Sequence, residues 1–309
     1  MVALDIKRFA PTDDMSAVYE LLRAVEQADG VRPLSDHLWI DLRQGGRPGF
    51  AGLLARPPGH SHDVAYCQVS RGNDSWALDL VIHPQHRDDT ATVGPLLLAE
   101  AMKIVGQQGG GHVHWWVSDP TEIHSALAET INFRRGRTIW QMRVPLPLDM
   151  AIVESAREIV TRPFRVGLDD QAWLDVNNRA FASHPEQGGW TLDILQSRQN
   201  EPWFDPNGLL IYELDEKLAG FCWTNLHTDT NPIQGEIYVV AVDPTVVGKG
   251  LGRALTVAGL VHLANVGAAI GMLFVDAENT PAVSLYQALG FTTHHVESAF
   301  VGDIRASNR

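Results

Sequence analysis

One pattern occurs twice in this chain, with about 160 residues between the two copies. Residues 76–84 (WALDLVIHP) and 236–244 (EIYVVAVDP) are both strand-like runs that end in proline, and a helical pattern follows each of them. Further along, residues 122–133 and 283–291 both have the pattern of a short helix that leads into a strand. A long-period repeat indicates a duplicated domain, and 309 residues are enough for two separate cores.

The order of the predicted elements indicates the fold of each copy. Each half begins with a helical segment (residues 14–26 and 169–182), continues with strand pairs, and then alternates long strands with helices. Pro145 and Pro147 lie in the stretch that separates the halves. We therefore predict an α/β fold (an α+β mixed sheet) with two tandem domains at residues 1–147 and 163–309, joined by a linker at 148–162. Each domain is expected to be a mixed, largely antiparallel sheet flanked by helices.

The charge distribution argues against two classes of partner. The formal net charge is −13, and residues 146–309 carry 20 Asp and Glu against 10 Lys and Arg. An acidic domain repels nucleic acid and anionic membranes, whereas it suits an amine-bearing small molecule. We therefore expect a small-molecule substrate and neither nucleic acid nor membrane as a partner.

Several other features point to a cytoplasmic protein. Cys67 and Cys222 lie in separate strand-like runs and give neither a disulfide framework nor a zinc spacing. The N-terminus has no apolar signal core. Residues 254–275 lack charged side chains, but glycines and His262 interrupt them, so we predict a buried helix that stops near Gly267 and then a buried strand at 272–275, not a membrane span. His184 and the other histidines have no metal-ligand spacing, so no metal is expected, and a monomer is the expected state.

The segment 236–253 (EIYVVAVDPTVVGKGLGR) has the pattern of a phosphate-binding loop. Its strand ends at proline, and three glycines then lead into an apolar helix that begins near Leu251. Glycines let a backbone approach a ligand closely, and the N–H groups of a helix start attract phosphate. The terminal Lys-Ser/Thr pair of a Walker loop is missing, and Arg253 stands where a dinucleotide fingerprint needs its third glycine. A helix start with incidental glycines is the alternative for this loop taken alone.

The spacing that remains resembles the acyl-CoA loop of the GNAT N-acetyltransferase superfamily, Gln/Arg-x-x-G-x-G/A, with Gly250 and Gly252 at its glycines and Val247 at its first position. Residues 279–291 (NTPAVSLYQALGF) resemble the second signature of that superfamily, N-x-x-A-x-x-L-Y-x-x-x-G-F, at six positions. The resemblance implies acetyl-CoA as co-substrate and Tyr286 as the general acid that protonates the departing thiolate. Without it, Tyr286 would be interpreted as a core residue.

A reaction of this class needs a general base to take a proton from the attacking amine, and a carboxylate within reach can do this. Glu236 begins the strand that runs to the glycine loop, which is a rigid position for a base. The backbone N–H groups of Val240, Ala241 and Val242 are candidates to polarise the thioester carbonyl. A solvated charge at a strand end is the alternative interpretation of Glu236.

The first half lacks this set of residues. Residues 87–94 (RDDTATVG), opposite the glycine loop, contain one glycine and two aspartates. If Phe133 is aligned with Phe291, Ala128 stands where Tyr286 does, and if Pro84 is aligned with Pro244, Trp76 stands where Glu236 does. The first domain is therefore predicted to be a degenerate, non-catalytic copy, and whether it binds CoA is left open.

Within the superfamily, the second half resembles the mycothiol synthase family of actinobacteria, through residues 181–191 (FASHPEQGGWT), 203–208 (WFDPNG) and the segments quoted above. The first half resembles it more thinly, through MVALD, residues 29–31 and LVIHPQ. The resemblance implies transfer of acetyl from acetyl-CoA to the cysteinyl amine of a Cys-glucosaminyl-inositol conjugate, the last step of mycothiol biosynthesis. One domain would be catalytic and the other a degenerate copy.

The resemblance also implies roles for individual residues. Glu186, Glu236 and Asp36 would contact the substrate. Asn225 stands where the family commonly has a substrate-binding lysine, and Phe274 where it has a tyrosine. The backbone that binds CoA would be contributed by Val240, Ala241, Val242, Val247, Gly248, Lys249, Gly250, Leu251, Gly252 and Arg253, together with Asn279.

Two other functions remain open. The departures at Asn225 and Phe274 are compatible with a tandem acetyltransferase that acts on a different amine, such as an aminoglycoside, a polyamine or a protein N-terminus. The loss of the motifs in the first half is compatible with a binding module that responds to acyl-CoA without turnover.

Overall fold

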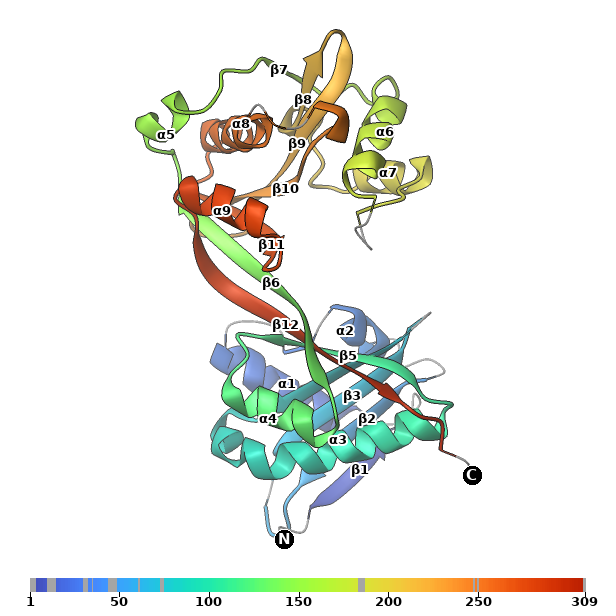
Figure 1. Ribbon diagram of the computed structural model, residues 1–309. Coiled ribbons are helices and arrows are strands. Elements are labelled where there is room, and N and C mark those ends of the chain that lie inside the picture. The colour runs from blue at the N-terminus through green and yellow to red at the C-terminus, as the bar shows by residue number, and fades with distance from the viewer. Residues whose placement is uncertain are drawn as a thin grey trace. The chain divides into compact units, whose positions relative to one another are not determined.

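The computed structural model describes residues 4–9, 15–29, 33–34, 36–43, 49–60, 62–72, 75–182, 187–246, 248 and 250–307, with the side chains of residues 36 and 37 excepted. The chain divides into two compact units. Unit 1 comprises Met1–Ile139 and Val296–Arg309, and unit 2 comprises Trp140–His295. Both units are drawn in Figure 1.

Unit 1 is a mixed sheet in the order β1-β2-β3-β4-β5-β12. Only β4 and β5 pair in parallel, while β1 with β2, β2 with β3, β3 with β4 and β12 with β5 are antiparallel. The elements are β1 (Asp5–Phe9), α1 (Ser16–Asp29), α2 (Asp36–Arg43), β2 (Ala51–Arg56), β3 (Ala65–Arg71), β4 (Trp76–Ile82), η1 (Pro84–Asp89), α3 (Thr90–Gln107), β5 (Gly111–Ser118), α4 (Glu122–Thr130) and the first part of β6 (Arg134–Pro145), with β12 (Thr292–Ile304) entering from the C-terminal end.

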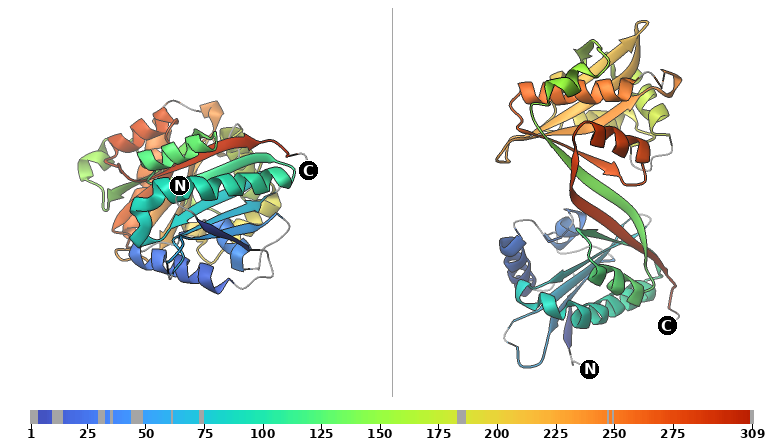
Figure 2. Two further views of the ribbon diagram at one scale, coloured as in Figure 1. Left: turned by 90° about the horizontal axis from the view of Figure 1, so that it is seen from below. Right: turned by 60° about the vertical axis from the view of Figure 1, so that its left-hand side comes forward.

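Alternating side chains give this unit three layers, because successive residues of a strand face opposite sides of the sheet. Leu53 on β2 packs in the cluster that includes α3, whereas its neighbour Leu54 packs in the cluster that includes α1 and α2. Helix α1 buries Val18 and Leu22 along with Leu21 and Val25, the spacing of one helical face. The left-hand view of Figure 2 shows α1 (blue) and α3 (teal) on opposite sides of the blue strands.

Unit 2 repeats this plan with the strand order β6-β11-β10-β9-β8-β7. Strands β10 and β11 are parallel, and β7 with β8, β8 with β9 and β9 with β10 are antiparallel. Its elements are α5 (Met150–Glu154), β7 (Thr161–Pro163), α6 (Asp170–Ala180), α7 (Leu192–Gln199), η2 (Pro206–Gly208), β8 (Leu209–Leu214), β9 (Lys217–His227), β10 (Gln234–Val242), η3 (Pro244–Val246), α8 (Leu251–Asn265), β11 (Ile270–Asp276) and α9 (Thr280–Ala288), together with the second part of β6 and the start of β12.

The same alternation builds two cores in unit 2. Phe221 and Trp223 on β9 pack in the cluster with α6 and α7, and Cys222 between them packs in the cluster with α8. In Figure 1, α8 lies on one side of β9 and β10, and α6 and α7 lie on the other. The mixed sheets with helices on both faces confirm the fold class predicted from the sequence.

The charge-free stretch 254–275 folds as predicted. It forms most of α8, and the chain then turns at Gly267, which has a φ of 100°, before it enters β11. Among the described residues, no helix combines the length and the apolar character needed to cross a membrane.

The observed division differs from the predicted domain boundaries in two places. Strand β12 pairs with β5 from Glu297 opposite Ser118 to Ile304 opposite Gly111, so the C-terminal segment completes unit 1 rather than unit 2. The predicted linker at 148–162 contains α5, and its apolar residues Ile152, Val153, Ala156 and Ile159 pack against the core of unit 2. A strand-like pattern predicts that a segment pairs but does not identify the sheet edge that it joins.

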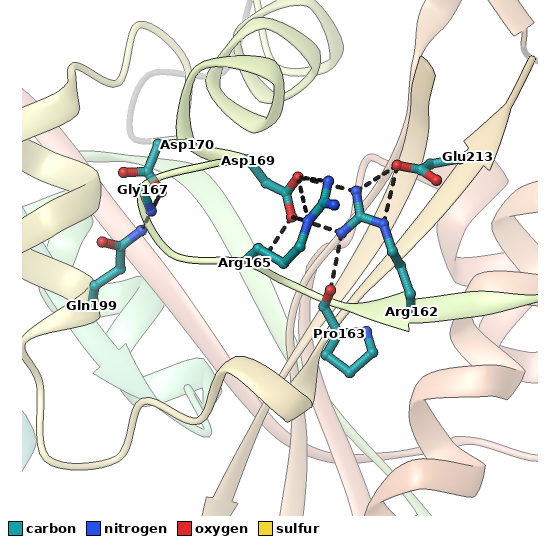
Figure 3. A network of polar contacts seen from close by, with 8 residues as sticks. All are labelled: Arg162, Pro163, Arg165, Gly167, Asp169, Asp170, Gln199 and Glu213. Carbon is teal, nitrogen blue, oxygen red and sulfur yellow. Dashed lines mark hydrogen bonds and ion pairs between the residues drawn. The ribbon is translucent and has the colours of Figure 1, made fainter. Parts of the chain in front are cut away.

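A buried carboxylate fixes the start of unit 2 (Figure 3). Asp169 accepts hydrogen bonds from Arg162 on β7 at 2.7 and 3.0 Å, and from the side chain and backbone of Arg165, while Arg162 also bonds Glu213 on β8. Burial of Asp169 acts to raise its pKa, but the hydrogen bonds from Arg165 and Arg162 outweigh this effect and hold the pKa of Asp169 well below its usual range. The network ties β7, β8 and the first turn of α6 together.

Candidate active site

The sheet of unit 2 opens between its two parallel strands. Strands β10 and β11 pair only from Gln234 opposite Ile270 to Glu236 opposite Met272. Beyond Glu236, β10 continues to Val242 without a described strand on that edge, while β9 still pairs with its other edge. Since N–H groups alternate sides along a strand, every second amide of this stretch faces the opening. Val240, Ala241 and Val242 lie on this stretch, which pairs with β9 but not with β11. Backbone N–H groups that face the opening are therefore in a position to act as donors.

A β-bulge distorts β10 at the point where the opening begins. The register with β9 shifts between Ile237 and Val239, so Tyr238 is an extra residue on β10. A bulge twists a strand and re-aims its groups, and bulges are common next to active sites. The sequence pattern alone gives no sign of this bulge.

Glu236 is the last residue of β10 that pairs with β11, so it lies where these two strands diverge. Its Oε2 atom is 2.9 Å from Nε2 of His227, at the end of β9. The Glu236 side chain is 13% exposed and that of His227 is 30% exposed. The hydrogen bond to Glu236 raises the pKa of His227 above its usual value, against the opposing effect of partial burial, and the charges of Glu236 and Asp229 add to the increase. The two side chains therefore form an imidazolium–carboxylate pair as pH falls.

Asn225 stands directly opposite Glu236 in the sheet register and is 8% exposed. Its Nδ2 atom is 3.5 Å from Oε2 of Glu236 and 3.4 Å from Nε2 of His227. Its Oδ1 atom is buried and has no hydrogen-bond partner among the described residues. A buried acceptor without a donor costs roughly 1–3 kcal/mol, so this oxygen is suited to receive a donor from a bound molecule.

Tyr286 lies on α9, partly buried against the core that contains α8. Burial raises the pKa of Tyr286 to about 12. Its ring centroid is 5.8 Å from that of Phe291. The hydroxyl is therefore protonated at neutral pH, which is the state that a proton donor needs.

The other residues of the 279–291 motif shape the helix that carries Tyr286. Oδ1 of Asn279 accepts the N–H of Ala282 at 3.3 Å and caps the start of α9. Gly290, with a φ of 91°, ends the helix in the left-handed conformation, and Phe291 is buried beyond it. The structure thus gives Asn279, predicted to bind the cofactor, a capping role.

The glycine loop leads into α8 as predicted. Gly248 has a φ of 95°, and Gly250, with a φ of 71°, is the N-cap of the helix. A Cβ atom at either position would meet no atom within 4 Å, so both glycines border open space. No acidic side chain lies in the first turn. The unbonded N–H groups of that turn and the helix dipole favour an anion there.

Side chains around this loop are committed elsewhere. Leu251 is buried in the core, and the guanidinium of Arg253 donates to Oγ of Ser155 at 2.9 Å and to the carbonyl of Ala288 at 3.4 Å. Asp243, just before the loop, receives two bonds from Thr245 and one from Arg179. The described side chains next to the loop are therefore engaged within the protein itself.

Other predicted residues are placed less completely. Glu186, Val247 and Lys249 lie outside the described residues, and Asp36 is the first residue of α2, in unit 1, with its side chain outside them. Phe274 on β11 is 47% exposed. Trp190, in the segment 181–191, packs in the core with its ring 5.7 Å from that of Trp173.

The sequence prediction did not include His227. Its position two residues after Asn225 on β9 places both side chains on the same face of the sheet. That spacing could have indicated the contact once Asn225 was paired with Glu236.

Unit 1 opens at the corresponding place. Strands β4 and β5 pair from Trp76 opposite Val113 to Leu78 opposite Trp115. A cavity of about 810 Å³ lies beyond, lined by the ends of both strands and by Asp29, Asp79, Asp119 and Glu297 among others. The register puts Leu78, not Trp76, at the position of Glu236, because β10 has additional residues before its proline. Neither residue can act as a base, and Ala128 is buried in the core.

Comparison with known proteins agrees with this architecture. Residues 171–291 match the acetyltransferase (GNAT) family. A GCN5-related N-acetyltransferase from Sphaerobacter thermophilus has the same fold, with a TM-score of 0.68 at 23% identity over 99% of this chain and 97% of that one. A tandem GNAT protein from the clavulanic acid biosynthesis pathway gives a TM-score of 0.64 at 16% identity over 99% and 100%. The chain is an acetyl-CoA-dependent N-acetyltransferase of the GNAT class.

Relatives with known names identify the branch of that class. A mycothiol acetyltransferase from Thermobispora bispora is 42% identical over 92% of this chain and 94% of its own length. A mycothiol acetyltransferase from Acidimicrobium ferrooxidans is 37% identical over 95% and 96%. The chain belongs to the mycothiol acetyltransferase family, and its acceptor is a small molecule.

Proposed function

We propose that this enzyme transfers the acetyl group of acetyl-CoA to the cysteinyl amine of a Cys-glucosaminyl-inositol conjugate, the last step of mycothiol biosynthesis. The name shared by relatives that match nearly the whole chain supports this acceptor. The observation that carries the chemistry is the position of Glu236, a partly buried carboxylate at the point where β10 and β11 diverge.

In the proposed reaction, the neutral amine of the acceptor attacks the thioester carbonyl, a C–N bond forms and the C–S bond breaks. Glu236 takes one proton from the amine. Because His227 and Asn225 both approach Oε2 of Glu236, its Oε1 atom is left for that proton. Backbone N–H groups of β10 between Glu236 and Val242 that face the opening would stabilise the charge that develops on the carbonyl oxygen.

Tyr286 would supply the proton that the departing thiolate takes up. A phenol whose pKa is about 12 carries its proton at neutral pH, so it can donate a hydrogen bond and then the proton to the sulfur as negative charge develops on it. The phenolate that results, the stronger base of the two, would regain a proton from solvent.

Binding of the co-substrate would rest on backbone groups. The loop at Gly248 and Gly250 and the first turn of α8 would hold the pyrophosphate of CoA. Unit 1, which has apolar Leu78 at the position of Glu236, is proposed to be a degenerate copy without catalytic activity.

Acetylation of a different amine is the second candidate. Two observations favour it: Asn225 offers a buried acceptor without a partner among the described residues, and Phe274 offers an exposed apolar ring. Neither side chain carries the charge of a lysine or the hydroxyl of a tyrosine, so the polyol part of the acceptor could differ.

The test compares the enzyme's activity on different acceptors, each assayed separately. The enzyme is incubated with acetyl-CoA and either the Cys-glucosaminyl-inositol conjugate, an aminoglycoside, a polyamine or an N-terminal peptide, and thiol release and the mass of the product are followed. We expect the highest kcat/KM with the conjugate, a loss of turnover in Glu236→Gln, and unchanged turnover in Glu158→Gln, which alters an exposed glutamate of the same unit. Preferential acetylation of another amine would refute the proposed acceptor and leave the proposed chemistry standing.

A further inference from the structure

Three histidines from separate parts of unit 1 come together at one end of its sheet. His62 lies between β2 and β3, His83 directly follows β4, and His86 lies in η1. Each offers a ligand atom, and these atoms all lie within 4.8 Å of one another. Nε2 of His62 is 2.9 Å from Nε2 of His86. Ring centroids are 5.1 Å apart for His62 and His86 and 5.2 Å apart for His62 and His83.

We propose that His62, His83 and His86 form a binding site for a transition-metal dication, with Zn²⁺ as the best fit. Imidazole nitrogen is a preferred ligand of Zn²⁺, and a triad of histidines is one of its common ligand sets. The site is separate from the acetyl-transfer chemistry proposed for unit 2, and it does not depend on that proposal.

The present geometry is close to what a metal ion needs. Zn–N bonds of about 2.0–2.1 Å in a tetrahedral site place the nitrogen atoms roughly 3.4 Å apart. The His62–His86 contact is shorter than this distance, and all three ligand atoms lie within 4.8 Å of one another, so small side-chain rotations are sufficient. All three side chains are at least partly exposed, and His62 lies in a loop, so the rings have room to rotate.

A carboxylate already orients one of the rings. Nδ1 of His86 is 3.1 Å from Oδ2 of Asp89, which leaves Nε2 directed toward the cluster. A metal-bound histidine usually donates its second nitrogen to such a carboxylate or to a carbonyl group. His83 has a different second contact, since its Nδ1 accepts the N–H of Gln85 at 3.3 Å. This long bond would be lost on ligation through Nε2, because Nδ1 of the neutral ring would then carry the proton.

The fourth position of the metal would be taken by water or by His60. The ring centroid of His60 is 5.5 Å from that of His86 and 6.2 Å from that of His62. A structural site would use this fourth histidine, whereas a site with water would keep a position open.

The location of the cluster gives the metal a defined effect. Segment η1 connects β4 to α3, just as η3 and the glycine loop connect β10 to α8 in unit 2. At this junction unit 1 has His83, His86 and Asp89. A bound metal would link the β2–β3 loop to this junction, two segments that are distant in sequence, and so stabilise unit 1.

The experiment is a titration of the metal-free, full-length protein with Co²⁺ and Zn²⁺, followed by visible absorption for Co²⁺ and by calorimetry for Zn²⁺. We expect one high-affinity ion per chain and a higher melting temperature with metal. His86→Ala is expected to abolish this binding. Asp89→Asn, which keeps all three histidines, is expected to weaken it roughly 10- to 100-fold.

The matched control is His112→Ala. His112 also pairs with a carboxylate of unit 1, Asp303 at 3.0 Å. Its substitution should leave metal affinity unchanged. Circular dichroism of each metal-free variant checks that unit 1 is folded. The proposal fails if the wild type binds neither ion. It also fails if folded His86→Ala binds both ions as the wild type does, or if the cluster binds inorganic phosphate and no metal.

Discussion

Replacing Glu236 by glutamine tests the base assignment most directly. Glutamine keeps the shape of the side chain and an oxygen that can accept from Asn225 and His227, but it cannot take a proton at neutral pH. A positioned general base contributes about 10²- to 10⁴-fold, which corresponds to about 3–5 kcal/mol of transition-state stabilisation. We expect kcat/KM to fall by this factor, with little change in the affinity for acetyl-CoA.

The same variant has a second consequence that depends on pH. Glu236 raises the pKa of His227, so the pair stabilises the folded state fully below the unfolded pKa of histidine, about 6.5. This contribution is lost as pH rises through the higher pKa of the folded state. Because His227 is 30% exposed, solvent screens the pair, and we expect Glu236→Gln to lower the free energy of unfolding by about 1 kcal/mol at pH 5.5 and by less at pH 9.

Three measurements separate the possible outcomes. Steady-state rates of thiol release give kcat/KM, urea unfolding at the two pH values gives stability, and NMR titration of the histidine ring protons gives the pKa of His227. In Glu236→Gln that pKa should fall toward its ordinary value. A loss of kcat/KM below tenfold would refute the base assignment, and a His227 pKa that does not move would refute the pairing.

Four further substitutions test other parts of the structure. Tyr286→Phe should lower kcat at least about tenfold with unchanged affinity for acetyl-CoA in equilibrium binding, and unchanged turnover would exclude Tyr286 as the acid. Asp169→Asn should destabilise the protein by about 3–5 kcal/mol at pH 7. Because the pKa of Asp169 is depressed in the folded state, the difference in stability from wild type in urea melts should shrink as pH falls below about 4. A difference that stays constant with pH would contradict the ion network. Gly259→Ala places a Cβ 2.4 Å from Sγ of Cys222 and should lower the free energy of unfolding by about 1–3 kcal/mol. Gly252→Ala, whose Cβ would have its nearest contact at 3.7 Å, should lower it less. Equal melting temperatures for the two variants would show that the core adapts freely.

The fold was predictable because its signals are local. The charge-free stretch 254–275 became α8 and β11, and the predicted helix at 169–182 became α6, since apolar periodicity and glycine stops act within a few residues. The destination of β12 was not predictable, because pairing with β5 links Ser298 to Val117, positions far apart in sequence.

The candidate site likewise has parts that could be predicted from the sequence and parts that could not. Tyr286 and the glycine loop follow from motifs whose residues are consecutive, and several of those residues, such as Asn279 and Gly290, turn out to hold the backbone. The contact between His227 and Glu236 depends on the register of β9 against β10, and that register contains a bulge. The histidine cluster is a similar case. His62 and His83 are far apart in sequence, and the pairing of β3 with β4 brings them close together in space.

The duplication explains why such details matter more than the fold. In both units the parallel strands separate after three residue pairs, so each sheet opens at the same place. Among the residues that the structure describes, unit 2 alone has a carboxylate at the last pair, a bulge just beyond it and glycines before the next helix. An opening in the sheet is therefore a property of the shared backbone, whereas the proposed acetyl-transfer chemistry uses side chains that unit 1 does not have at the corresponding positions. At the junction between β4 and α3, unit 1 instead carries imidazoles, which suit a metal ion better than a pyrophosphate.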